Sequence, residues 1–405
     1  MTTTYAYKVR NQQGQVIEGT LDATSRELVA SKLREMGYVP IEVTQRNKSV
    51  LSAEFKLPGA TKVGVRDLAV MARQMSTMIG AGMPLIRALN TLRDQTENQT
   101  LVRTIGELRT DIERGSSLYQ AIERHDKVFP PLFAPMIRAG ETGGVLDTVL
   151  ERLARTLEKQ AELRGKVRSA MAYPVMVGIL VVLIATGMLI FIVPRFETIY
   201  ANLNGTLPTP TRILLAISRT LTSKGWVVVL LLVVGVYLFR SWIATTRGRL
   251  RFDGFKLRAP IFGKLVSKTA LARFSRTLAS LTRAGVPVME SLNIVANTSG
   301  NAVIKQGIDE SRERVRHGSS ISAAIAGHSV FPPMVVQMMA VGEETGALDD
   351  MLEKMAEFYE EEVEATVNAL TSLIEPLLMV FMGVVVGGMI IALYMPIFKL
   401  ITIVK

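Results

Sequence analysis

The chain has 405 residues, a formal net charge of +11 and no cysteine, which excludes disulfides and thiolate metal sites. Hydrophobic residues make up 48% of it, and its mean hydropathy is +0.28. These values are typical of a protein with segments inside a lipid bilayer. Because many Lys and Arg residues flank the apolar segments, anionic lipid is a simpler partner than nucleic acid, and we expect no nucleic-acid binding.

Residues 1–45 read as a small α/β unit. Two segments that alternate like strands surround a polar turn, and a helical segment followed by a third strand completes the unit. Residues 46–63 contain Pro58 and Gly59 between charged and polar residues, which is typical of a linker. We therefore predict a small N-terminal domain and a linker, followed by the main body of the chain.

Two segments carry no charged residue and are long enough to cross a bilayer as helices, Ser169 to Pro194 and Pro376 to Phe398. About 20 apolar residues suffice, and a helix satisfies its own backbone groups in lipid. A third segment, from Gly225 to Phe239, must continue past Arg240, whose side chain can reach the interface. We predict transmembrane helices at residues 169–194, 225–246 and 373–398.

The distribution of basic residues predicts the side of the membrane on which each segment lies. Lys and Arg are dense before the first span and after the second, and sparse in residues 195–224 and 399–405. Cytoplasmic flanks carry the excess of basic residues, and the first residues lack the pattern of a signal peptide. We expect an inner-membrane protein with a cytoplasmic N-terminus, an extracytoplasmic loop at 195–224 and an extracytoplasmic C-terminal tail at 399–405.

The sequence contains an internal duplication of a helical module together with its membrane span. The segment from Val128 to Ala154 matches the segment from Val330 to Ala356 without gaps, and about half of the positions are identical. The two modules fall at residues 64–168 and 247–372, and the middle span returns the chain to the same side. The predicted fold class is mainly α: two duplicated cytoplasmic six-helix bundles with three transmembrane helices and the small N-terminal α/β unit.

The first helix of each module shows one apolar face. Leu68, Met71, Met75 and Met78 recur in the second copy as Leu271, Phe274, Leu278 and Leu281, which is helical spacing. A Gly-x-Pro sequence follows each of these helices and can end one helix and begin the next, or contact a partner. The residues of this candidate structural motif are Gly82, Pro84, Gly285 and Pro287.

A second motif, Gly140-Glu-Thr-Gly-Gly in the first copy and Gly342-Glu-Glu-Thr-Gly in the second, precedes the long final helix of each module. It is either a turn with glycines at positive φ and Glu or Thr capping the next helix, or a contact with a partner. The candidate partner residues are Glu141, Thr142, Glu343 and Glu344, and the candidate structural glycines are Gly140, Gly143, Gly342 and Gly346. We expect the helix from Val145 to continue into the membrane.

The final helices of the two modules differ in charge. The helix from Asp349 is acidic at i, i+4 spacing, which destabilises an isolated helix, whereas its counterpart in the first module is basic. The two helices meet within or between subunits, or the acidic face is solvated, or its carboxylates hold a metal ion such as calcium. The candidate interface residues are Glu353, Glu357, Glu361, Arg152, Arg155 and Lys159.

The motifs of common enzyme classes are absent from the sequence. There is no phosphate-binding Gly-x-x-x-x-Gly-Lys loop, and none of the three histidines lies in a ligand pair. Glu375, before Pro376 at the start of the third span, is a structural boundary residue or a proton relay. We therefore expect neither catalysis nor a cofactor.

The two Gly-Glu-x-x-Gly-x-Leu-Asp segments and the Phe-Pro-Pro repeats, together with Glu375-Pro-Leu-Leu-Met-Val-Phe-Met-Gly-Val, resemble the GspF/PilC family over essentially the whole chain. These are inner-membrane platform proteins of type II secretion and type IV pilus machines. The C-terminal Tyr394-Met-Pro-Ile-Phe-Lys-Leu resembles the pilus branch more than the secretion branch.

The resemblance implies a homo-oligomer that couples a cytoplasmic pilus assembly or retraction ATPase to the extraction of pilins. It also implies contact with other inner-membrane assembly proteins. The secretion branch is the alternative, with a role in pseudopilus assembly. A small-solute or protein-conducting channel is a further alternative, against which the spans offer no charged residues to line a path.

Overall fold

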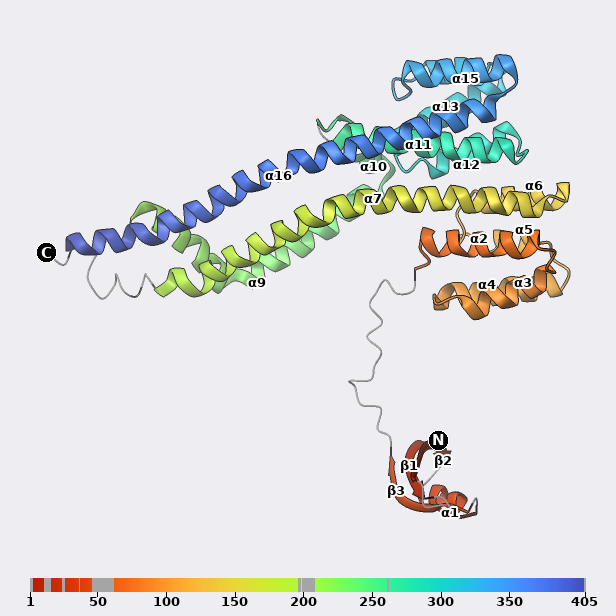
Figure 1. Cartoon of the computed structure of the whole chain (residues 1–405). Helices are drawn as coiled ribbons and strands as arrows, with labels where there is room; N and C mark the ends of the chain where they lie inside the picture. Colours follow the sequence, from red (N-terminus) through yellow and green to blue (C-terminus); the bar gives the residue numbers. More distant parts are fainter. Residues whose placement is uncertain are drawn as a thin grey trace. The chain divides into compact units, whose positions relative to one another are not determined.

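The computed structural model divides into two compact units, Met1–Lys62 and Val63–Lys405 (Figure 1). It is mainly helical. The residues that it describes are 3–10, 16–23, 26–35, 37–45, 62–195, 198, 208–260 and 262–403. Most of the predicted linker 46–63, part of the predicted loop 195–224 and the end of the predicted tail 399–405 lie outside these residues.

The first unit contains an antiparallel sheet packed against one helix. The strands pair in the order β2-β1-β3, with Tyr5 of β1 opposite Leu21 of β2. Tyr5 and Val9 are buried with Val29 and Leu33, because strand period and helix period place each pair on one face. The elements are β1 (Thr3–Arg10), β2 (Val16–Ala23), α1 (Arg26–Glu35) and β3 (Val39–Gln45).

The second unit contains two sets of helices in the same order. The first set is α2 (Val65–Gly80), α3 (Leu85–Gln95), α4 (Gln99–Glu113), α5 (Leu118–Glu123), α6 (Phe133–Gly143) and α7 (Leu146–Gly187). The second set is α11 (Phe262–Arg283), α12 (Val288–Thr298), α13 (Ala302–Arg316), α14 (Ile321–Ala326), α15 (Pro333–Thr345) and α16 (Leu348–Ile403). Between the sets lie the π-helical turn η2 (Met188–Ile192), α9 (Thr209–Ala244) and α10 (Thr246–Arg258).

The predicted apolar face of the first helix of each set is confirmed. Leu68, Met71 and Met75 of α2 are buried, and Met78 is packed against the same cluster. The four matching residues of α11, beginning at Leu271, are all buried. Each face packs against the long final helix of its own set, so that α2 lies on α7 and α11 lies on α16.

Gly82 and Gly285 end α2 and α11 as predicted, each with φ near +80°, where a side chain would be strained. Pro84 and Pro287 are the N-cap residues of α3 and α12, directly before the first helical position of each. Proline suits this position because the first N–H groups of a helix have no intrahelical partner.

The prediction that Gly140, Gly143 and Gly342 adopt positive φ in a turn is wrong, because these residues lie inside α6 and α15. The left-handed residue that ends each helix is Gly144 or Gly346, with φ of 67° and 71°. A Cβ atom on Gly140 would lie 3.1 Å from Cβ of Val149, and one on Gly342 would lie 2.9 Å from Cα of Leu348. These two glycines therefore permit the close crossing of each helix with the start of the next.

The final helix of each set continues without a break into an apolar segment. Residues Leu146–Arg195 form one helical stretch of 50 residues through α7 and η2, and α16 spans 56 residues. Pro174 lies within α7, and Pro376 and Pro396 lie within α16. The expectation that the helix from Val145 continues toward the membrane is confirmed, with its first helical residue at Leu146.

Residues 209–224, which we expected to be part of an extracytoplasmic loop, are helical. They form the first part of α9, and Lys224, with φ of −120° and ψ of 19°, separates this part from the apolar segment. Leu215 is buried with Val193 and Leu393, and Oγ1 of Thr211 donates to the carbonyl of Ala392 at 2.5 Å. Packing against the ends of the two long helices therefore extends this helix.

Within the described residues, three helices are long and apolar enough to cross a membrane, in agreement with the predicted number. Their most apolar windows are at most 17% buried within the protein. Large side chains such as Leu183, Leu231 and Val384 are more than half exposed in these windows. A belt of exposed apolar residues on helices of this length matches the hydrocarbon core of a bilayer.

We predict that Gly342→Ala lowers the stability of the protein by about 1–3 kcal/mol, because the added methyl group meets backbone rather than a movable side chain. Gly106→Ala in α4 is the control. Its Cβ would meet nothing within 4 Å, and the second copy carries Asp309 at the matching position. This control should raise stability by about 0.5–1 kcal/mol. Thermal unfolding of the full chain in detergent measures both, and an equal effect of the two substitutions would contradict the assignment.

Candidate partner interface

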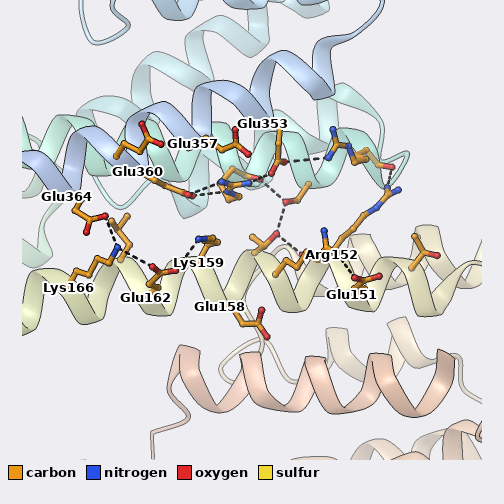
Figure 2. Close-up of a pocket in the computed structure, with 18 residues that line it drawn as sticks. Glu151, Arg152, Glu158, Lys159, Glu162, Lys166, Glu353, Glu357, Glu360 and Glu364 are labelled. Atoms are coloured by element: carbon orange, nitrogen blue, oxygen red, sulfur yellow. Dashed lines mark hydrogen bonds and ion pairs between the residues drawn. The ribbon is translucent and has the colours of Figure 1, made fainter. Parts of the chain in front are cut away.

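The long helices α7 and α16 lie side by side, with α11 next to both (Figure 2). Lys166 of α7 donates from Nζ to Oε2 of Glu364 on α16 at 2.7 Å. Oγ1 of Thr156 on α7 lies 2.7 Å from Oγ of Ser280 on α11, and both side chains are buried. The basic and acidic helices therefore meet within one chain.

The acidic residues of α16 are held mainly by α11. Arg276 bonds Glu360 through Nε at 2.8 Å and Nη2 at 2.9 Å, and its Nη1 bonds Glu353. Arg283 bonds Asp349 at 3.1 Å and Asp350 at 2.6 Å. Two arginines of the second module thus offset part of the charge repulsion that the acidic spacing creates.

The basic candidates of α7 have other partners. Arg155 pairs with Glu151 at 2.7 Å and Lys159 pairs with Glu162 at 3.2 Å, both on their own helix. Arg152 donates through Nη1 to the backbone carbonyl of Arg283. The structure therefore brings the basic and acidic candidates together without pairing them directly.

The pairing of Arg276 with Glu360 repeats an interaction of the first module. Arg73 of α2 bonds Glu158 of α7 at 2.8 Å and 2.7 Å with the same bidentate geometry. The match of Arg73 with Arg276 in the duplicated sequence was the signal that could have located this pair. The two copies differ in exposure, since the side chain of Arg73 is 38% exposed and that of Arg276 is 9% exposed.

The electrostatics of the two pairs reflect this difference. The hydrogen bond from Arg73 holds the pKa of the Glu158 carboxyl below its usual range, outside the uncharged part of α7. Burial of Arg276 acts to lower its pKa, but the hydrogen bonds and charges of Glu360 and Glu353 outweigh burial, and the pKa is raised. Arg276 is therefore held charged in an environment with little water.

A charged cavity of about 880 Å³ lies between α7, α11 and α16 (Figure 2). Its lining includes the six interface residues predicted from the charge patterns, Arg152, Arg155, Lys159, Glu353, Glu357 and Glu361. Arg155 is 71% exposed. Glu361 is exposed and forms no ion pair with any residue that the structure describes. The cavity therefore offers both signs of charge to a polar partner.

Glu141 and Glu343 cap helices, but not the helices that we expected. Glu141 accepts from the backbone N–H groups of Leu118 and Tyr119 at 2.7 Å and 3.1 Å, at the start of α5. Glu343 accepts in the same way from Ile321 and Ser322 at the start of α14. A carboxylate there satisfies unpaired donors and the helix dipole. The prediction of capping the following helix is wrong because a helix N-terminus about twenty residues earlier lies closer.

The other candidates lie on the surface or carry no ligand geometry. Thr142 and Glu344 are exposed in the last turns of α6 and α15. Glu375 and Pro376 are exposed within α16, which continues through both. In the part of the chain that the structure describes, no group of three or more His, Asp or Glu side chains is arranged to hold a metal ion.

We predict that Arg276→Met lowers the stability of the protein by about 3 kcal/mol, because it leaves Glu360 unpaired in a poorly hydrated site and leaves Glu353 with only its longer contact to Arg283. The matched control is Arg73→Met, which should cost less than about 1 kcal/mol since its pair is more exposed. Unfolding of the full chain in detergent gives both values. Losses of equal size would show that burial of the second pair has no energetic consequence.

Comparison with protein families identifies this architecture. The family model described as "Type II secretion system (T2SS), protein F" matches twice, at residues 71–194 and 274–396, and the model of the N-terminal domain of the same protein matches residues 1–44. The chain is 43% identical to the "Type IV pilus assembly protein PilC" of Thermus thermophilus, over 98% of both chains. It is 38% identical to the protein of the same name from Myxococcus xanthus, over 98% of this chain and 95% of the other. It is 32% identical to the "Type II secretion system protein F" of Pseudomonas aeruginosa, over 98% of both. The chain therefore belongs to the type II secretion system protein F family.

Proposed function

We propose that this chain is the inner-membrane platform protein of a type IV pilus assembly machine. The observation that carries the proposal is the match to the pilus assembly protein of Thermus thermophilus along 98% of both chains. Within the described residues, the three apolar helices agree with an integral membrane protein of this family. The platform would couple a cytoplasmic assembly ATPase to pilin extraction and filament polymerisation.

The long helices supply a physical route for this coupling. The 50 residues of Leu146–Arg195 form a helical stretch about 75 Å long at 1.5 Å per residue. It begins in the first helical module and ends beyond the apolar segment, and α16 does the same for the second module. A force on either module is transmitted along a continuous helix to the membrane, where pilins are embedded.

The charged cavity is our candidate for contacts with partner chains, among them the ATPase, other inner-membrane assembly proteins and a second copy of this chain. Arg155 and Lys159 are both more than half exposed in their side chains, and Glu361 is exposed. Exposed charges change the rate and specificity of association more than they change folding. Thr142 and Glu344, which are exposed in the last turns of α6 and α15, are further candidates.

Secretion is the second candidate function. Relatives named as type II secretion proteins are 32% identical to the chain over nearly its full length. In that case the filament would be a pseudopilus that serves protein secretion. The two proposed functions share the platform role and differ in the filament that is assembled.

We predict that deletion of the gene abolishes surface pili, and that the full chain restores them. The tagged chain, extracted in mild detergent, should recover an assembly ATPase and a pilin, identified by mass spectrometry. Persistence of pili with loss of protein secretion would move the chain to the secretion branch. Persistence of both activities would refute the platform role.

We also propose a topology, with residues 64–168 and 247–372 in the cytoplasm and the segment before Lys224 on the opposite side. The support is the excess of Lys and Arg around both modules. The middle span returns the chain between two like modules.

This topology predicts a labelling pattern, which is simple to test because the chain has no cysteine. In spheroplasts, a membrane-impermeant maleimide should label Ser223→Cys and not Ser319→Cys or Gln120→Cys, although all three positions are exposed. Permeabilised cells are the control, in which all three should react. Labelling of Ser319→Cys in intact spheroplasts would overturn the topology.

A further inference from the structure

A second cavity, of about 600 Å³, lies between α7 and α11 and differs in character from the charged cavity. Its lining is mostly apolar, and it extends along α7 from Lys159 to Val175. Because the uncharged segment begins at Ser169, this apolar groove reaches the level at which the membrane begins. The apolar side chains that line it include Leu163, Val167, Met171, Ala172, Val175 and Leu265.

Arg273 lines the groove without a counter-ion. Its Nη1 lies 3.4 Å from the backbone carbonyl of Thr298, and a Cβ on Gly300 would lie 2.5 Å from the same nitrogen, which shows how closely the guanidinium is enclosed. Burial lowers the pKa of Arg273, and the charge of Arg164 lowers it further. Among the described residues, no carboxylate pairs with this guanidinium.

The remaining charges of the groove add to the positive excess. Arg164 and Arg168 of α7 line it and form no ion pair within the described residues. Lys159 also lines it and is paired with Glu162. The carboxylate in the lining belongs to Glu360, which is already held by Arg276. The groove therefore combines an apolar wall with arginines whose charge the chain leaves uncompensated.

The first helical module forms the same fold without an arginine at the position of Arg273. The matching position of the first module is Val70 of α2, where the alignment also places Arg73 opposite Arg276. A half-buried guanidinium without a counter-ion is costly, so its presence in only one of two like modules points to an external anion. An anion at the membrane surface that carries an apolar chain matches both the arginines and the apolar wall of the groove.

We propose that this groove binds an anionic phospholipid, with the phosphate at Arg164, Arg168 and Arg273 and an acyl chain along the apolar wall. Guanidinium groups pair with phosphate through planar, bidentate hydrogen bonds. The volume lies within the range of sites that enclose a small molecule. The site is independent of the pilus assignment, since it rests on the groove and its charges alone.

The test uses the full chain purified in detergent and titrated with phosphatidylglycerol, with native mass spectrometry to count retained lipids. We expect Arg273→Gln and Arg164→Gln each to weaken binding by about tenfold, as for loss of a charged hydrogen bond. Arg251→Gln is the matched control, because Arg251 is exposed on the basic helix α10 and does not line the groove. Its effect should be less than about twofold.

Two further measurements separate the alternatives. In lipid-free detergent, Arg273→Gln should unfold at the same temperature as the natural chain or higher, and phosphatidylglycerol should raise the unfolding temperature of the natural chain alone. Glycerol phosphate, which has no acyl chain, should not compete. Equal loss of binding in Arg251→Gln would reduce the site to diffuse surface attraction. Competition by glycerol phosphate would show that the groove binds phosphate alone and that the acyl chain does not contribute. Retention of no lipid would assign the groove to a protein segment instead. Each of these three results overturns the proposal.

Discussion

The structure depends on the continuity of two helices that pass from water into lipid. In a bilayer an unpaired backbone group has no water to bond, so a helix that enters lipid must keep its hydrogen-bond ladder. α7 and α16 do so although Pro174 and Pro376 each remove one donor. A continuous helix therefore joins each helical module to its membrane span and sets the direction in which the module extends from the membrane. The positions of α2 and α11, which pack on these helices, and of the two cavities beside them follow from that direction.

Duplication separates what the module requires from what was added to it. The bidentate pair of arginine and glutamate occurs in both copies, at Arg73 and at Arg276, and so does the glutamate that caps the fifth helix. These interactions lie inside a module and hold its helices together. Some residues that line the two cavities differ between the copies: Arg155 stands where the second copy has Glu357, and Arg273 stands where the first copy has Val70. Such differences allow two copies of one fold to contact each other as unlike surfaces.

The sequence predicted the spans and the apolar face of α2 because both signals are local and periodic. It did not predict that Gly140 lies within a helix, because the requirement there is the approach of Leu146 and Val149 rather than a backbone angle. It did not predict that Arg283 binds Asp349, because charge patterns along one helix say nothing about a partner on another. The start of α9 was missed for a similar reason. Its polar first turns are helical because they pack on the ends of the long helices.

The contact between the two modules combines apolar packing with a charged pair. Near the membrane, Leu163 and Val167 of α7 pack on an apolar cluster formed by Leu265 and Val363. At the same level, the direct contact of α7 with α16 also includes the half-exposed pair of Lys166 and Glu364, and half-exposed pairs contribute little to stability. Most of the buried apolar residues of the two modules belong to one continuous cluster. Burial of apolar side chains, rather than this exposed ion pair, therefore holds the two modules to each other.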